Sequence, residues 1–174
     1  MTFIGRTDDL AFLQDCYEES KAQLVVLYGR RRIGKTETLS HFAQDKPCLF
    51  FSAQMATKEE QLSEFSRRMF EEGAPAAAYL NRYADWRTAL EELTKLPSPA
   101  DGARRLVVID EFPYLVKADP SLPSVLQNLW DHTLRHANLM IVLCGSAMKV
   151  KQIDKTIDDN IRPMLNLNKN LEKF

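Results

Sequence analysis

A glycine-rich segment that follows an apolar run carries the most specific chemical signal in this sequence. Gly29 to Thr36 reads G-x-x-x-x-G-K-T, and the residues before it, Leu24 to Tyr28, have the composition of a buried strand. Phosphate oxygens need a concave array of backbone N–H donors, and glycines let the main chain fold tightly enough to supply one. The segment therefore predicts a loop that binds the phosphates of a nucleoside triphosphate.

Each residue of this loop has an expected role. Lys35 is expected to reach the β- and γ-phosphates, and the Thr36 hydroxyl is expected to ligate Mg²⁺. A helix that begins here directs the positive end of its dipole at the anion. The other loop residues expected to bind the nucleotide are Gly29, Arg30, Arg31, Arg32, Ile33 and Gly34.

Two neighbouring carboxylates end another apolar run, Leu106 to Ile109, and supply the second half of the predicted site. The run is short and unbroken, which suits a parallel strand covered on both faces. At the carboxyl edge of such a sheet Asp110 faces the phosphate loop and can hold Mg²⁺ through water. Glu111 is a predicted catalytic residue, because a carboxylate beside the metal-binding aspartate can polarise a water for attack on the γ-phosphate. The alternative is that Glu111 only solvates the strand end.

Ser146 follows the last clear apolar run, Leu139 to Cys144. At this position a hydroxyl could hydrogen-bond the γ-phosphate or the attacking water, which makes Ser146 a further candidate catalytic residue. A Gly-Ser pair after a strand is also ordinary turn chemistry. Both interpretations stay open at this point.

Strands and helices must alternate along the chain to position these residues. Strands are predicted at 24–28, 48–52, 106–111 and 139–144. Helices are predicted after an extended segment 3–10, from Lys35 to about Ala43, from a capping box at Thr57 and Glu60 to about Glu72, from the cap Asp85 through Leu93, and after a proline-rich loop with Ser124 as cap. This alternation implies βαβ crossovers. The predicted fold class is α/β, an ASCE-type P-loop NTPase fold with a three-layer αβα sandwich and a mostly parallel sheet.

Length, charge and cysteine content narrow the class of protein. A chain of 174 residues with a net charge of −1 suggests one domain without global attraction to nucleic acid or to an anionic membrane. No apolar run approaches the roughly 20 residues that span a bilayer, and the first residues lack the layout of a signal peptide. We therefore expect a cytoplasmic protein with no membrane partner. Cys16, Cys48 and Cys144 are expected to be reduced packing residues.

Two further patterns have a less specific chemical meaning. The run Arg30 to Arg32 adds positive potential near phosphate, and contact with DNA is the alternative interpretation. His132 and His136 are expected on one helix, at the i, i+4 spacing of a zinc pair. They lack an adjacent glutamate and a third ligand, so a solvent-facing pair is the favoured interpretation.

With these residues in place, the chain resembles the AAA-type ATPases related to the signal-transducing STAND group, in particular an archaeal and bacterial family with an arginine-rich phosphate loop. The segments that carry the resemblance are Phe3 to Arg6, Gly29 to Thr36, Ile109 to Leu115, Leu126 to His132 and Leu143 to Ser146. The resemblance implies that the nucleotide is ATP and that Phe3, Ile4, Gly5 and Arg6 border its adenine. A β-turn before a helix is the alternative role of these four residues.

The resemblance ends after Ser146. Family members continue into another strand, an arginine-bearing segment near the γ-phosphate and a helical lid, and the tail of this chain does not match these parts. We therefore expect a P-loop ATPase core at 1–147 and a divergent helical or irregular tail at 148–174. Slow hydrolysis by this chain alone is the corresponding expectation, because an arginine finger typically accounts for about 10³ to 10⁵ in turnover.

The predicted function is ATP binding with Mg²⁺ and hydrolysis by water attack on the γ-phosphate. Lys35, Glu111 and Ser146 are the predicted catalytic residues, and Thr36 and Asp110 are the predicted metal ligands. The alternative is a non-hydrolysing switch, in which ATP occupancy drives self-association or binding of a protein partner. A DNA-associated module that uses the arginine run is the third interpretation.

Overall fold

The structure is a computed structural model that describes residues 7–29 and 34–146 of the chain. Of Tyr28 and Ser146 only the backbone is described. The segments 1–6, 30–33 and 147–174 lie outside the described residues, and with them lie the predicted tail and several of the predicted nucleotide-binding residues.

Four parallel strands form a single sheet in the described part of the chain. They are β1 (Gln23–Gly29), β2 (Cys48–Ser52), β3 (Arg105–Asp110) and β4 (Leu139–Ser146). Their order is β1-β4-β3-β2, so β4 lies between the strand that enters the phosphate loop and the strand that ends in Asp110. Because all pairs are parallel, each connection must cross a face of the sheet.

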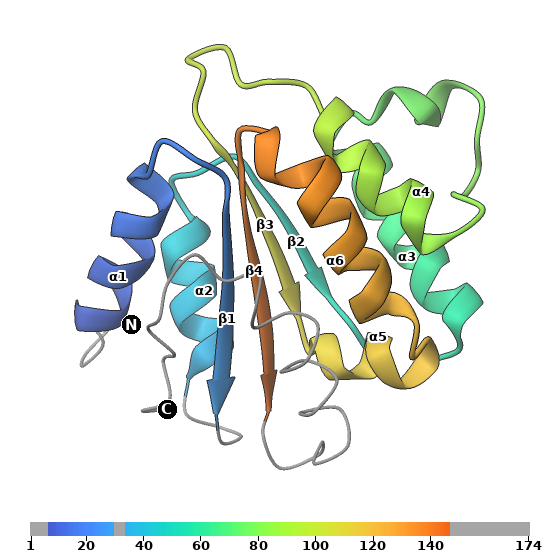
Figure 1. Cartoon of the computed structure of the whole chain (residues 1–174), viewed down its shortest axis with the longest axis horizontal. Helices are drawn as coiled ribbons and strands as arrows, with labels where there is room; N and C mark the ends of the chain where they lie inside the picture. The colour runs from blue at the N-terminus through green and yellow to red at the C-terminus, as the bar shows by residue number, and fades with distance from the viewer. Residues whose placement is uncertain (1–6, 30–33, 147–174) are drawn as a thin grey trace.

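Helices cover both faces of the sheet (Figure 1). On one face lie α1 (Thr7–Glu18) and α2 (Lys35–Ala43). On the other face lie α3 (Lys58–Glu71), α4 (Trp86–Glu91), α5 (Phe112–Ala118) and α6 (Leu122–His132). Single 3₁₀ turns occur at Pro75–Ala78, Glu92–Lys95 and Leu134–His136. The structure thus confirms the predicted α/β three-layer sandwich with a parallel sheet.

The central strands are apolar on both faces because helices cover both. In β3, Val107 and Ile109 belong to the core shared with α3 to α6, whereas Leu106 and Val108 belong to the core shared with α1 and α2. Each of these side chains is at most 2% exposed. Burial of one aliphatic side chain contributes roughly 1.5–3 kcal/mol. An unbroken apolar run therefore stabilises both layers of helices at once.

Two predicted helix starts are confirmed. At α3 the Glu60 N–H donates to Thr57 Oγ1 over 3.2 Å and the Thr57 N–H donates to the Glu60 carboxylate over 2.9 Å, which completes the capping box. At α4 the Thr88 N–H donates to the Asp85 carboxylate over 2.7 Å. Both caps supply partners for N–H groups that a first helical turn leaves unpaired.

Some boundaries differ from the sequence prediction. Residues 7–10 are helical rather than extended, because α1 already begins at Thr7; Asp8 and Asp9 in its first turn suit the positive end of a helix. Helix α4 ends at Glu91, and Leu93 lies in the 3₁₀ turn that follows.

The start of α6 was also predicted wrongly. The helix begins at Leu122, after Ser121, rather than after Ser124. The physical reason is Pro123, which fits the first turn of a helix because the N–H that proline lacks has no helical partner there.

The two histidines do not share a helix, contrary to the prediction. His132 is the last residue of α6, and His136 lies in the separate 3₁₀ turn, because Thr133 between them has φ −133° and ψ −60°. Among residues 7–29 and 34–146 no group of three or more His, Cys, Asp or Glu is arranged to hold a metal ion.

Candidate nucleotide-binding site

A glycine with a left-handed conformation lies directly before α2, at the end of the predicted phosphate loop. Gly34 has φ 80° and ψ 22°, which residues with a Cβ adopt only at a cost. Its carbonyl accepts hydrogen bonds from the Thr38 N–H at 2.9 Å and from the Thr38 hydroxyl at 2.8 Å. Lys35 follows as the first residue of α2 and is only 8% exposed. Lysine is rarely buried without a specific interaction, so this position is a candidate for a role in binding.

The structure brings the two predicted metal ligands into direct contact. Thr36 lies in the first turn of α2, and its hydroxyl donates a hydrogen bond of 2.8 Å to Asp110 Oδ2 at the end of β3. The residues are 74 positions apart in the sequence. The crossover connections of a parallel sheet therefore place the two halves of the predicted site side by side, at the carboxyl ends of the strands.

Asp110 is buried and its carboxylate is held on both oxygens. The side chain is only 3% exposed, and while Oδ2 accepts from Thr36, Oδ1 accepts from the Glu111 N–H at 2.9 Å. A buried carboxylate is tolerated only when hydrogen bonds compensate for the loss of water. The orientation of the Asp110 side chain is consequently set by the protein and not by solvent.

Glu111 has a backbone conformation that no other described residue outside glycine shares. Its φ is 55° and its ψ is 38°, the left-handed region, at the position just before α5. The Glu111 carbonyl accepts from the Tyr114 N–H at 2.9 Å, and the half-buried side chain caps no backbone N–H of α5. A left-handed residue with a Cβ costs roughly 1–3 kcal/mol, and such residues cluster at functional sites. The predicted strand 106–111 therefore ends one residue early, because the chain turns at Glu111.

Cys144 lies closer to the site than the sequence indicated. It is 1% exposed in β4, and burial, together with the negative charge of Asp110, raises the pKa of its thiol. The prediction of a reduced packing residue agrees with a free, buried cysteine. The strand order was the missing information, because β4 pairs with β3 through Leu143 and Ile109 and so brings the next residue beside Asp110.

The remaining predicted site residues are placed only in part. Gly29 and Ser146 end β1 and β4 and are paired in the sheet register, so the backbone of Ser146 lies beside the start of the phosphate loop. The Ser146 side chain lies outside the description. The same holds for the predicted nucleotide-binding residues Phe3, Ile4, Gly5, Arg6, Arg30, Arg31, Arg32 and Ile33.

The side-chain oxygens of Thr36 and Asp110 are suitable ligands for a magnesium ion. They are a hydroxyl and a carboxylate, and Mg²⁺ prefers oxygen ligands. Mg²⁺ is commonly bound by one or two protein oxygens together with water and substrate phosphates. The pair is therefore suited to a metal that arrives with a nucleotide.

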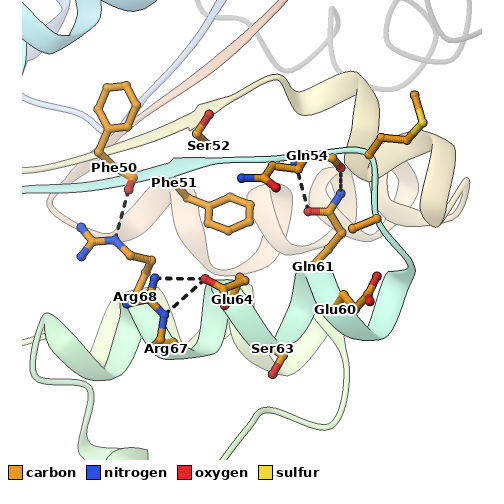
Figure 2. A pocket seen from close by; sticks show the side chains of 12 residues that line it. Phe50, Phe51, Ser52, Gln54, Glu60, Gln61, Ser63, Glu64, Arg67 and Arg68 are labelled. Atoms are coloured by element: carbon orange, nitrogen blue, oxygen red, sulfur yellow. Dashed lines mark hydrogen bonds and ion pairs between the residues drawn. The ribbon is translucent and has the colours of Figure 1, made fainter.

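A cavity of about 760 Å³ lies elsewhere, between β2 and α3 (Figure 2). At its wall Arg68 Nε donates to the Phe50 carbonyl over 3.3 Å, and the side-chain amide of Gln61 bonds both the N–H and the carbonyl of Gln54. Of the residues that the structure describes, none that is predicted to bind phosphate or metal lines it. The cavity borders the outer strand of the sheet and is not the predicted nucleotide site.

The sequence matches, over residues 3–165, a protein family described as an ATPase domain predominantly from Archaea. The chain belongs to this ATPase family. The matched segment begins at Phe3 and runs beyond Ser146, which extends the resemblance past the point at which the motifs end. The relation of this ATPase domain to the STAND group stays a prediction.

Two curated proteins of Methanocaldococcus jannaschii are similar to this ATPase domain. An uncharacterized protein is 25% identical over 148 residues, which make up 85% of this chain and 30% of that protein. An uncharacterized ATP-binding protein is 46% identical over 44 residues, which make up 25% of this chain and 75% of that protein. The ATPase domain thus spans less than a third of the first of these relatives.

Several solved structures have the same fold. The Walker-type ATPase of Pyrococcus abyssi is 22% identical with a TM-score of 0.69, and the match covers 94% of this chain and 51% of that chain. Cdc6p of Pyrobaculum aerophilum is 16% identical with a TM-score of 0.62, and the match covers 94% and 43%. The Drosophila ORC bound to DNA is 16% identical with a TM-score of 0.61, and the match covers 83% and 38%. At these identities the likeness shows the fold of P-loop ATPases.

No helix in the described ranges combines the length and apolar character that crossing a membrane requires.

Proposed function

We propose that this ATPase domain binds ATP together with Mg²⁺ and hydrolyses it, with Glu111 orienting the water that attacks the γ-phosphate. The observation that carries the proposal is the 2.8 Å hydrogen bond between Thr36 and Asp110. It joins the helix after the predicted phosphate loop to Asp110, the last residue of β3 and the neighbour of Glu111. Membership of an ATPase family supports ATP as the nucleotide.

Phosphate binding is assigned to the loop from Gly29 and to the start of α2. A helix N-terminus attracts anions through its unpaired N–H groups and its dipole, and the ammonium group of Lys35 adds a full positive charge. Phe3, Ile4, Gly5 and Arg6 are assigned to the adenine on the strength of the family resemblance.

Thr36 and Asp110 are the residues that would hold Mg²⁺. The Thr36 hydroxyl donates its proton to Asp110, which orients it and leaves its lone pairs free for a metal, and the Asp110 carboxylate would hold the metal through water. When bound, Mg²⁺ would supply positive charge that offsets the negative charge of the phosphate oxygens.

Glu111 is assigned the role of general base. It follows Asp110 directly, and its left-handed backbone turns the chain away from the strand at the carboxyl edge of the sheet. In the proposed step the carboxylate accepts a proton from water while the water oxygen bonds to the γ-phosphorus and the bond to the leaving ADP oxygen breaks. The backbone of Ser146 pairs with Gly29 in the sheet, and the Ser146 hydroxyl would hydrogen-bond the γ-phosphate or this water.

The decisive experiment compares the wild-type protein with Glu111→Gln and with the control Glu91→Gln. Glu91 is an exposed glutamate in α4, so its substitution makes the same chemical change away from the site. We expect Mg²⁺-dependent phosphate release by the wild type and by the control. In Glu111→Gln we expect ATP binding at wild-type affinity and a release rate about 10² to 10⁴ times lower, the usual contribution of a general base.

The same measurements separate this proposal from the alternatives. Tight ATP binding by the wild type without any phosphate release would replace hydrolysis by a nucleotide-dependent switch. Release by Glu111→Gln at the wild-type rate would remove the assigned base. DNA association stays a separate prediction, and it fails if duplex DNA does not bind at low salt or binds equally well after Arg30, Arg31 and Arg32 are neutralised.

A further inference from the structure

A glycine in β4 lies unusually close to a proline in α5. A Cβ built on Gly145 would stand 2.7 Å from Pro113 Cδ and 2.8 Å from Pro113 Cγ. Carbon atoms that are not bonded pack at about 3.5–4.0 Å, so no side chain fits at position 145 unless the proline ring moves. Both residues are buried, which leaves the ring little room to do so.

The backbone conformation does not explain why a glycine stands here. The described glycines with positive φ are Gly34, Gly73 and Gly102, and Gly145 is not one of them. Gly145 also lies inside β4 and pairs in the sheet with Tyr28, so it is not part of a turn. Glycine is therefore required at this position because the Pro113 ring leaves no space for a side chain.

Pro113 lies close to Glu111 in the chain. It lies in the first turn of α5, two residues after Glu111, and its ring fixes its own φ. The left-handed conformation of Glu111 is held on one side by the hydrogen bond from its N–H to Asp110 and on the other by the Tyr114 N–H that donates to its carbonyl. A costly conformation persists only where surrounding contacts determine it, and the proline ring against β4 is such a contact.

We propose that Gly145 and Pro113 are positioning residues, and that the contact between them holds the start of α5 so that Glu111 faces the attacking water. The inference rests on the proposed role of Glu111. It implies that two short segments far apart in the chain act together to position Glu111. These segments are Glu-Phe-Pro-Tyr after β3 and Cys-Gly-Ser at the end of β4.

The test uses the variants Gly145→Ala and Pro113→Ala and the double variant. The added methyl group of Gly145→Ala should push α5 and Glu111 out of place, whereas Pro113→Ala removes the two ring carbons that the methyl group would meet. We expect Gly145→Ala to lower phosphate release at saturating ATP by about tenfold to a hundredfold, since small misplacements of reacting groups have effects of this size. The ATP dissociation constant should stay within about threefold of wild type. In the double variant the release rate should return to that of Pro113→Ala.

Gly73→Ala is the matched control. Gly73 also lies against a proline, with Pro97 Cγ 3.1 Å from a built Cβ, but at the end of α3 and away from the site. Its φ of +89° makes a substitution costly for folding. We expect this variant to unfold more easily and yet to release phosphate at the wild-type rate, which separates lost stability from lost positioning.

A second readout does not depend on hydrolysis. Amide hydrogen exchange at Glu111 and Tyr114 reports the two hydrogen bonds that hold Glu111. It should accelerate in Gly145→Ala relative to wild type and return in the double variant to the rate in Pro113→Ala. If the wild type releases no phosphate but exchange follows this pattern, the contact stands and the proposed function fails.

Other outcomes overturn the inference. Phosphate release and amide exchange at wild-type rates in Gly145→Ala would contradict it. A loss of phosphate release from Gly145→Ala that is equally large in the wild-type and the Pro113→Ala background would also contradict it. If Gly145→Ala does not fold, a double variant that folds and releases phosphate like Pro113→Ala supports the contact. A double variant that also fails to fold contradicts it.

Discussion

The two ends of the same sheet are built in different ways. At the amino ends of the strands each of the three guanidinium nitrogens of the buried Arg104 donates a hydrogen bond within the protein. It donates to the Lys21 carbonyl at 2.6 Å, to the Glu19 carbonyl and to Asn138 Oδ1 at 3.3 Å, and the Tyr17 hydroxyl donates to the Arg104 carbonyl. Burial lowers the pKa of Arg104 below its ordinary value.

At the carboxyl ends of the strands, two buried charged residues lie near a residue with a costly backbone conformation. Lys35 and Asp110 are 8% and 3% exposed, and the neighbouring Glu111 has positive φ. Gly145 lies against Pro113 without space for a methyl group. The hydrogen bonds at the amino ends are typical of a network that stabilises the fold. The conformations at the carboxyl ends are typical of a functional site, where the placement of side chains lowers the free energy of unfolding. Substitutions at the two ends should therefore affect different properties, ATP affinity at the carboxyl ends and the free energy of unfolding at the amino ends.

The largest expected effect is that of Lys35→Ala on ATP affinity. Removal of a buried charged partner costs about 2–5 kcal/mol in binding, or roughly 30- to 5,000-fold in the dissociation constant. If Lys35 binds phosphate as proposed, the free energy of unfolding should change by less than the free energy of ATP binding. Calorimetric titration with ATP and urea unfolding measure the two quantities, and Lys117→Ala, at an exposed lysine in α5, is the control. Unchanged ATP affinity would falsify the site assignment.

Arg104→Met should show the opposite pattern. The substitution keeps much of the side-chain volume but leaves the Glu19 and Lys21 carbonyls and the Asn138 amide oxygen without their donor. We expect the free energy of unfolding to fall by about 3 kcal/mol, while the folded fraction binds ATP with wild-type affinity. Arg82→Met, at an exposed arginine, controls for the loss of a charge. A selective loss of ATP affinity in Arg104→Met would break the proposed division between the two ends.

The smallest expected effect concerns an ion pair that joins α3 to the segment between α5 and α6, at the carboxyl ends of the strands. Asp119 lies between α5 and α6, and its carboxylate bonds Lys58 Nζ at 3.0 Å and the Ser121 hydroxyl at 2.6 Å. Burial raises the pKa of Asp119, but the hydrogen bonds from Ser121 and Lys58 outweigh it and hold the pKa below its ordinary 3.8.

A carboxyl group with a lowered pKa stabilises the fold above its ordinary pKa, and this contribution is lost as the pH falls through the value in the folded state. We therefore expect the free energy of unfolding of the wild type to decrease more steeply below pH 3.8 than that of Asp119→Asn. Chemical unfolding between pH 2 and pH 6 measures the difference, with the exposed Asp131 changed to Asn as the control. Parallel pH profiles for wild type and Asp119→Asn would show that the ion pair contributes nothing.

The sequence predicted the elements whose signals are local. Helix α2 and strand β2 have the predicted bounds, and the capping box at Thr57 is present as expected. Periodicity and capping depend on residues a few positions apart, so they can be recognised without the rest of the fold. Helix α5 was missed because it has only seven residues and begins Phe-Pro, which also suits a loop.

The G-x-x-x-x-G-K-T segment, which predicts a phosphate loop, and the Asp-Glu pair could be recognised in the sequence, since both are contiguous motifs. Only the tertiary structure decided that Thr36 meets Asp110 and that Cys144 lies beside it. The order β1-β4-β3-β2 brings these residues together, and that order depends on crossovers between distant segments. The left-handed backbone of Glu111 and the contact of Gly145 with Pro113 also emerge only in the folded chain, because a steric limit between the end of β4 and the start of α5 has no trace in the neighbouring residues of either.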